Sequence, residues 1–184
     1  MKFLKKTAQI LGITILLLVL FRGWIFRKTV HYTNISERAK IEITNKNLLA
    51  EIEKEKNKRD LSIEEIIEIA ERVTNRNLKF TTKKVSNNPN EVTKAGKANC
   101  IGYAALFNAI GTYLIEEQND EGKYQMHHLI GKLNFMGIDL HSFFSHPLFK
   151  DHDYNQIEIL ETEKSIYIDP SASDYLKIHQ ITSK

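Results

Sequence analysis

Cys100 is the only cysteine in the 184-residue sequence, and it lies where a polar loop changes to an apolar helical pattern. A single cysteine cannot form a disulfide within its own chain, so the thiol is buried filler, an intermolecular crosslink or a reactive group. The pattern predicts a helix from about Asn99, which places the thiol beside unpaired backbone N–H groups and the positive end of the helix dipole. Because both features stabilise a thiolate, Cys100 is the best nucleophile candidate in the sequence.

A cysteine nucleophile needs a base to take its proton and a group that orients the base. The sequence offers seven histidines, which are His31, His127, His128, His141, His146, His152 and His179. His152 is distinguished by its position, because it begins a predicted strand over 152–160 that is followed by a second predicted strand ending at Asp169. Adjacent antiparallel strands can bring His152 and Asp169 together, and the carboxylate then holds the imidazole in one tautomer.

His152 also belongs to a possible metal site. His141, His146 and His152 follow one another closely in the sequence. Three aspartates lie near them, namely Asp139, Asp151 and Asp153. The spacing fits no standard zinc pattern, and a polar loop accounts for these residues. We therefore expect neither a metal nor a cofactor.

Taken in order, Cys100, His152 and Asp169 resemble the core of the transglutaminase-like superfamily of papain-related cysteine enzymes. In that family a cysteine begins a helix, a histidine leads one strand and an aspartate leads or closes another. The segment 152–157 matches the family pattern of His, a small residue, Trp, Asn and alternating apolar positions, with Tyr154 in place of the tryptophan. The family's aspartate is usually followed by a small residue or a proline within an aromatic-flanked strand, and the segment 167–170, with Tyr167 before Asp169 and Pro170 after it, fits this pattern. Gly131 also agrees with the usual layout. The resemblance covers roughly 62–175.

The resemblance implies a papain-like or transglutaminase-like α+β core, in which the catalytic helix packs on an antiparallel sheet. It implies that Cys100 attacks an amide or ester carbonyl, that His152 accepts and later returns the proton, and that Asp169 orients His152. An acyl-enzyme thioester would pass its acyl group to water or to an amine, so the expected activity is that of a cysteine protease, amidase or transglutaminase on a protein or peptide amide. We favour hydrolysis. The alternative is an inactive module of this fold that binds a peptide or a cell-envelope component.

The oxyanion site departs from the family pattern. The backbone N–H of Cys100 would be one donor. Relatives often take the second donor from an upstream glutamine or tryptophan, but residues 62–99 contain neither. The candidates to replace it are Asn87, Asn88, Asn90 and Asn99. Relatives also often have glycine at the position of Ala98, where alanine can adopt the same backbone unless φ is positive.

The N-terminal segment indicates a membrane anchor. A basic start precedes the uncharged, largely apolar stretch 7–21, and the apolar character continues past Arg22 to Phe26. The uncharged stretch rises only about 22 Å as a helix, whereas 7–26 reaches about 30 Å, the thickness of the hydrocarbon layer. We expect residues 1–28 to form an uncleaved single-pass signal anchor, with a cleaved signal peptide as the alternative. Basic residues lie on both sides, so the secretory type of architecture is the reason to expect the catalytic domain outside the cytoplasm.

The rest of the chain is expected to form a stalk or accessory helix over 29–61 and a transglutaminase-like domain over 62–184. A capping box at Ser62 and Glu65 predicts a helix that continues to about Thr74. A second helix is predicted from about Asn99, followed by a long strand or bent pair over 124–140, broken at Gly131 and Gly137. Helices followed by antiparallel strands favour an α+β fold. The net charge of +3, without a basic stripe interleaved with aromatic residues, indicates that nucleic acid is not a partner.

Overall fold

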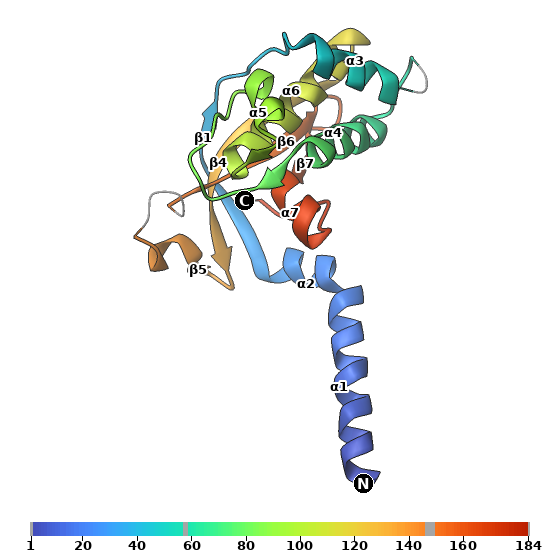
Figure 1. Ribbon diagram of the computed structural model, residues 1–184, viewed down its shortest axis with the longest axis vertical. Coiled ribbons are helices and arrows are strands. Elements are labelled where there is room, and N and C mark those ends of the chain that lie inside the picture. The colour runs from blue at the N-terminus through green and yellow to red at the C-terminus, as the bar shows by residue number, and fades with distance from the viewer. Residues whose placement is uncertain (1, 57–58, 146–149, 184) are drawn as a thin grey trace.

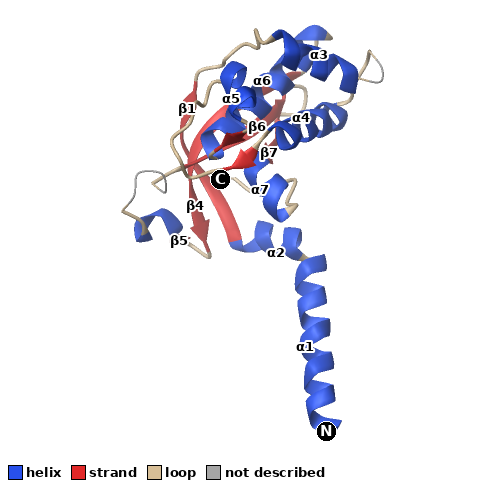
Figure 2. Ribbon diagram, in the orientation of Figure 1, coloured by secondary structure: helices blue, strands red, loops and turns tan. Residues whose placement is uncertain are grey.

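The computed structural model describes residues 2–56, 59–145 and 150–183. They form an antiparallel sheet in the order β1-β4-β6-β7, with the short β5 paired to β4, and helices pack against it (Figures 1 and 2). The strands are β1 (Val30–Arg38), β4 (Tyr124–Phe135), β5 (Ile138–Asp139), β6 (His152–Ile159) and β7 (Lys164–Ile168). A separate parallel pair joins β2 (Lys79–Phe80) to β3 (Lys97–Ala98). The prediction of an α+β fold with an antiparallel sheet is confirmed.

Seven α-helices lie within the described residues, together with one short 3-10 helix, η1 (Leu140–Phe143). They are α1 (Lys2–Leu20), α2 (Arg22–Thr29), α3 (Lys46–Glu55), α4 (Ile63–Asn77), α5 (Pro89–Ala95), α6 (Cys100–Glu117) and α7 (Pro170–Leu176). The central helix is α6, which packs against α4, α5, α7 and strands β4 and β6. Its side chains are buried almost all round, so it is a core helix and carries no polar stripe.

Two hydrophobic clusters cover the two faces of the sheet. The larger one joins α3, α4 and α6 to inward-facing strand residues such as Met126 and Ile157. The smaller one contains Tyr32, Leu129 and Tyr154, which alternation along the strands places on the opposite face. The C-terminal segment covers this second cluster with Ile178 and Ile181. Both faces of β4 and β6 are therefore buried where the candidate site residues lie.

The segment 29–61, expected to be a stalk or accessory helix, is part of the same folded unit. β1 pairs with β4 along its whole length, apart from a bulge between Asn34 and Ser36. α3 places Leu48 and Ile52 in the larger cluster. α3 lies where an accessory helix was one of the two expectations, whereas the pairing of β1 with β4 joins segments about a hundred residues apart, which local periodicity does not reveal.

The prediction of a strand break at Gly131 was wrong. Gly131 lies inside β4, between Asn34 of β1 and His152 of β6. A Cβ atom at this position would be 2.7 Å from the Thr33 carbonyl oxygen and 2.7 Å from the Tyr154 ring, so glycine is required by close packing. The break at Gly137 is confirmed, because this residue adopts a φ of 88° in the turn between β4 and β5.

At the N-terminus, α1 extends away from the domain and meets α2 at a bend of 68° (Figure 1). Among the described residues no single helix is both long and apolar enough to cross a bilayer, although the bent pair meets that criterion by length and composition. Arg22 lies at the bend, and its guanidinium donates hydrogen bonds to the carbonyl oxygens of Leu176 (2.8 Å) and Lys177 (3.3 Å). The start of α2 is thus tied to the end of α7.

Candidate active site

Cys100 is the first residue of α6 and is buried. The preceding Asn99 is the N-cap, and its side-chain oxygen accepts a hydrogen bond from the backbone N–H of Gly102 at 3.3 Å. A Cβ atom at Gly102 would lie 2.7 Å from that of Ala98, so glycine lets the loop approach the helix closely. The first N–H groups of a helix have no partner inside it, and those of Cys100 and Ile101 are therefore available to an oxyanion.

His152 and Asp169 are brought together by the antiparallel pair β6 and β7. His152 is the first residue of β6, and its Nε2 lies 2.7 Å from Oδ2 of Asp169. Asp169 follows β7 and is the N-cap of α7, where its Oδ1 accepts hydrogen bonds from the N–H groups of Ser171 and Ala172 and from the Ser171 hydroxyl. The helix start therefore fixes Oδ1 and leaves Oδ2 facing the imidazole.

The side chain of Cys100 lies close enough to the His152 ring to contribute to the rise of its pKa. Nε2 is bonded to Asp169, so Nδ1 is the ring nitrogen left for the thiol. The structure thus brings together the three residues singled out in the sequence, in the order thiol, imidazole, carboxylate. Each comes from a different element: Cys100 from α6, His152 from β6 and Asp169 from the junction of β7 with α7.

The electrostatics of His152 and Asp169 favour a charged imidazole on His152. Burial lowers the pKa of His152, but the charge and hydrogen bond of Asp169, with a further contribution from Cys100, raise it well above its ordinary value. Burial likewise opposes ionisation of Asp169, but the charge of His152 and hydrogen bonds from His152, Ser171 and Tyr32 lower its pKa to about 2. An imidazole held by a carboxylate beside a cysteine is the arrangement that serves a thiol nucleophile.

Tyr32 is a member of this site that the sequence did not indicate. It lies on β1, and its hydroxyl donates a hydrogen bond of 2.7 Å to Oδ2 of Asp169. The edge of its ring faces the ring of His152, with 5.8 Å between centroids. Burial and the neighbouring carboxylate raise the pKa of Tyr32 well above its ordinary value, so the phenol stays protonated and acts as a donor. Tyr32 and Asp169 are 137 residues apart, and no local motif marks the tyrosine.

Three of the four asparagines considered as oxyanion donors have structural roles. Asn99 caps α6, Asn88 caps α5, and Asn90 bonds the backbone of Thr44 and Asn45. Asn87 is different. Its side-chain oxygen is buried without a hydrogen-bond partner among the described residues.

Asn87 lies at the start of α6. Its side-chain oxygen is 3.5 Å from the place that a Cβ atom of Gly102 would occupy. It lines a cavity of about 440 Å³ together with Arg38 and Ile101. A terminal amide can turn its nitrogen to the position that its oxygen holds, so Asn87 is the uncommitted amide near the first turn of α6.

A second buried polar cluster lies on the α6-facing side of the same strands. Asp153 is fully buried, and its carboxylate binds Nε2 of His128 (2.8 Å) and both Nε and Nη2 of Arg38. Burial raises the pKa of Asp153, but hydrogen bonds from His128 and Arg38 outweigh it and lower the pKa. The cluster joins β1 and β6 across β4. It also explains Asp153, which the sequence linked to a possible metal site.

No group of three or more His, Cys, Asp or Glu side chains suited to a metal ion occurs within residues 2–56, 59–145 and 150–183. His146, one of the three histidines of the metal alternative, lies outside the described residues. Of the other two, His152 binds Asp169.

An apolar cavity of about 290 Å³ is lined in part by His152 and Asp169. Side chains of α2, β1, β2, β4 and α7 form the rest of its wall. Those side chains include Phe26, Phe80, Leu133, Ala172, Tyr175 and Leu176. The exposed walls are almost entirely carbon.

Comparison with protein-family models, with curated proteins and with solved structures found no match.

Proposed function

We propose that this protein is a thiol acyl-transfer enzyme with a papain-like or transglutaminase-like core, in which Cys100 is the nucleophile. The observation that supports this most directly is the position of His152, whose ring is hydrogen-bonded to Asp169 and lies close to the side chain of Cys100. A cysteine that merely fills space in a core needs no such partners. The order of nucleophile, base and orienting group is the pattern by which these sites are recognised.

In the acylation half of the reaction, Nδ1 of His152 holds the proton of the Cys100 thiol, and the thiolate sulfur attacks the carbonyl carbon of an amide or ester. The carbonyl oxygen becomes an oxyanion, which accepts hydrogen bonds from the Cys100 N–H and from the amide of Asn87. The intermediate then collapses, the bond to the leaving nitrogen or oxygen breaks, and His152 gives its proton to the leaving group. The product is a thioester on Cys100.

In the second half, water or an amine attacks the thioester, and His152 removes the proton of the attacking group. The carbon–sulfur bond breaks, and the thiol is restored by the same proton. Asp169 and Tyr32 act as positioning residues. Asp169 holds the ring through Nε2, while the Tyr32 hydroxyl occupies the same carboxylate oxygen and limits its rotation. These steps require no metal and no cofactor.

A protein or peptide amide is the substrate class that the resemblance implies, with hydrolysis favoured over transfer to an amine. The anchor proposed for residues 1–28 holds the enzyme at a membrane by a single pass, with the catalytic domain outside the cytoplasm. The exposed hydrophobic side chains from Ile10 to Phe21 support attachment to a membrane, because exposed apolar surface of that extent is costly in water.

Alkylation of the purified full chain tests the nucleophile. Iodoacetamide at neutral pH is expected to label Cys100 at least about tenfold faster than it labels the same chain unfolded in urea. His152→Ala should reduce the rate to that of the unfolded chain. His127→Ala is the matched control, since His127 lies on β4 and pairs with Glu37 rather than with the site.

Labelling of folded Cys100 no faster than in the unfolded chain would contradict the proposed enzyme. That result would favour the binding module that the resemblance allows as an alternative. Mass spectrometry after incubation with an activated ester supplies a second readout, because an acyl-enzyme increases the mass of the wild type and leaves Cys100→Ala unchanged.

A further inference from the structure

The apolar cavity beside His152 lies at the end of the domain formed by α2 and α7. α2 contributes Phe26 to its wall, and α7 contributes Tyr175 and Leu176, both about half exposed. Arg22 binds the end of α7 directly, so this wall is continuous with the base of α1. The cavity therefore lies where the proposed membrane anchor joins the domain.

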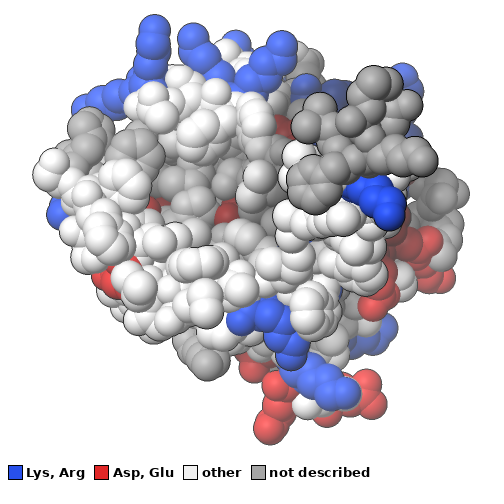
Figure 3. Space-filling view, turned by 90° about the horizontal axis from the view of Figure 1, so that it is seen from below, with Lys and Arg blue, Asp and Glu red and all other residues white. Residues whose placement is uncertain are grey.

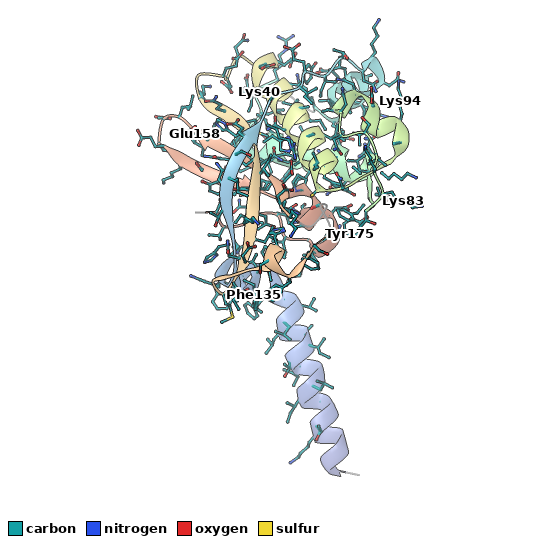
Figure 4. The ribbon with its side chains drawn as sticks, turned by 90° about the vertical axis from the view of Figure 1, so that its left-hand side faces the viewer. Lys40, Lys83, Lys94, Phe135, Glu158 and Tyr175 are labelled. Atoms are coloured by element: carbon teal, nitrogen blue, oxygen red, sulfur yellow. The ribbon has the colours of Figure 1, made fainter. Side chains whose placement is uncertain are left out.

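The surface around this end is rich in exposed hydrophobic side chains. Those outside α1 include Trp24, Phe135, Met136, Ile138, Phe143, Tyr175 and Leu176. We call these seven residues the apolar rim. The turn between β4 and β5 is fixed to α2 by a hydrogen bond from the Met136 N–H to the Thr29 carbonyl oxygen, at 2.8 Å. Phe135 lies beside the upper end of α1, whereas Lys40 and Glu158 lie at the far end of the domain (Figure 4).

The charges at this end suit a lipid surface. Seen from the end at which α1 leaves the domain, most of the described surface in the middle is uncharged, and charged side chains of both signs lie toward its edge (Figure 3). Arg27 and Lys28 of α2 are exposed next to the apolar rim. An uncharged middle with Arg27 and Lys28 beside the apolar rim fits the hydrocarbon and phosphate layers of a membrane.

We propose that the cavity beside His152 holds the hydrocarbon chain of a fatty-acyl substrate that enters from the membrane, and that the apolar rim rests on the lipid surface. This inference depends on the proposed function, because it names the acyl group that Cys100 accepts. The cavity has room for about ten methylene groups if each fills roughly the 30 Å³ of a water molecule. The chain would lie against Phe26, Leu133 and Leu176, with its carbonyl carbon at the Cys100 sulfur.

The chemistry is that of the proposed acyl transfer. The sulfur of Cys100 bonds to the fatty-acyl carbonyl carbon, the bond from that carbon to a nitrogen or oxygen breaks, and His152 protonates the departing amine or alcohol. The product is a fatty-acyl thioester, which water or an amine then takes up. The acyl group could come from a glycerolipid ester or from an N-acylated peptide, since both present the same chain and carbonyl to the cavity.

The test compares p-nitrophenyl esters of acetate, butyrate, octanoate and decanoate, with the full chain held in lipid nanodiscs. If each added methylene is buried in the cavity, kcat/KM should increase by about three- to fourfold per methylene until the cavity is filled. Leu133→Trp places a large ring in the cavity and should lower the ratio of decanoate to acetate kcat/KM at least tenfold. Leu160→Trp, beyond the end of β6, is the control that adds the same ring elsewhere and should leave the ratio unchanged.

Two failures are distinguishable. If acetate is cleaved through Cys100 but chain length and Leu133→Trp have no effect on the ratio, the hydrocarbon site is excluded and the thiol enzyme stands. If no ester of any length acylates Cys100, the proposed function itself fails.

The source of the acyl group is read from the mass of the thioester on Cys100. The full chain is given nanodiscs of phosphatidylcholine with deuterated acyl chains, and separately an N-decanoyl peptide. A fatty-acyl adduct from either one supports the inference and identifies the donor. If neither donor gives a fatty-acyl adduct while p-nitrophenyl acetate still acetylates Cys100, the inference of a hydrocarbon site is overturned.

Discussion

At the scale of single residues, the site depends on how the two oxygens of Asp169 are divided. Oδ1 is occupied by the first turn of α7, and Oδ2 is shared by His152 and Tyr32. Each hydrogen bond to the charged carboxylate makes its ionised form more favourable, and together they outweigh the cost of burial. One residue therefore ends a strand, begins a helix and fixes the imidazole.

Replacement of Asp169 by asparagine gives a pH-dependent loss of stability. Asparagine keeps the N-cap but removes the charge that His152 binds. The pKa of Asp169 falls from 3.8 to about 2 on folding, so its contribution is present above pH 3.8 and is lost as the pH falls toward 2. The pKa of His152 is raised, so the contribution of the pair is complete below 6.5 and is lost as the pH rises through the raised value.

The difference in unfolding free energy between wild type and Asp169→Asn should therefore be greatest between about pH 4 and 6.5, at about 2 kcal/mol. It should decrease on both sides of that window. Urea titrations of the full chain in micelles, followed by circular dichroism across the pH range, measure it. A difference that is constant from pH 3 to 9 would show that the two residues do not form a charged pair.

Substitution of Asn87 allows the effect of the proposed oxyanion donor to be measured separately from the reactivity of Cys100. An ester passes through an oxyanion when Cys100 attacks it, but alkylation by iodoacetamide displaces iodide and forms no oxyanion. We therefore expect Asn87→Ala to lower the rate of acylation by an ester about 10²-fold, and to change the rate of alkylation less than twofold. Stopped-flow acylation and mass-spectrometric alkylation of the same preparation measure the two rates. An equal decrease in both would mean that Asn87 supports the fold of the α6 start rather than the oxyanion.

At the scale of elements, the sequence predicted best those features that are carried by neighbouring residues. The Ser62 and Glu65 capping box begins α4 as expected, with both reciprocal hydrogen bonds present. The change from polar to apolar residues located the start of α6 at Cys100, and the alternation after His152 located β6. These signals act over one turn or one strand, so they survive without knowledge of the rest of the chain.

Features that depend on distant pairing could not be predicted in this way. β1 joins the sheet through β4, and only that pairing brings Tyr32 to Asp169 and Arg38 to Asp153. Gly131 illustrates the limit, because a glycine within an apolar strand pattern indicates either a break or a close approach. The Thr33 backbone and Tyr154 ring that decide between them come from two other strands.

At the scale of the whole molecule, the candidate site and the proposed anchor are connected by more than the chain itself. α2 joins them covalently, Arg22 binds the last carbonyls of α7, and Phe26 contributes to the cavity wall beside His152. The bend of 68° lets α1 leave the domain while α2 lies along its end. With α1 in a bilayer, this arrangement holds the cavity mouth against the lipid, so that a chain entering from the membrane need not cross water.

Trp24 reports directly on this arrangement, because it is the only tryptophan in the sequence and is 58 % exposed on α2. If α1 is inserted and α2 lies at the surface, the indole should be at the level of the headgroups, where tryptophan is favoured. In vesicles that hold the full chain, lipids brominated near the carbonyl end of the acyl chain should quench its fluorescence more strongly than lipids brominated near the chain terminus. The opposite order would place α2 deep in the bilayer as a continuation of α1, and no quenching by either lipid would place this end of the domain in water.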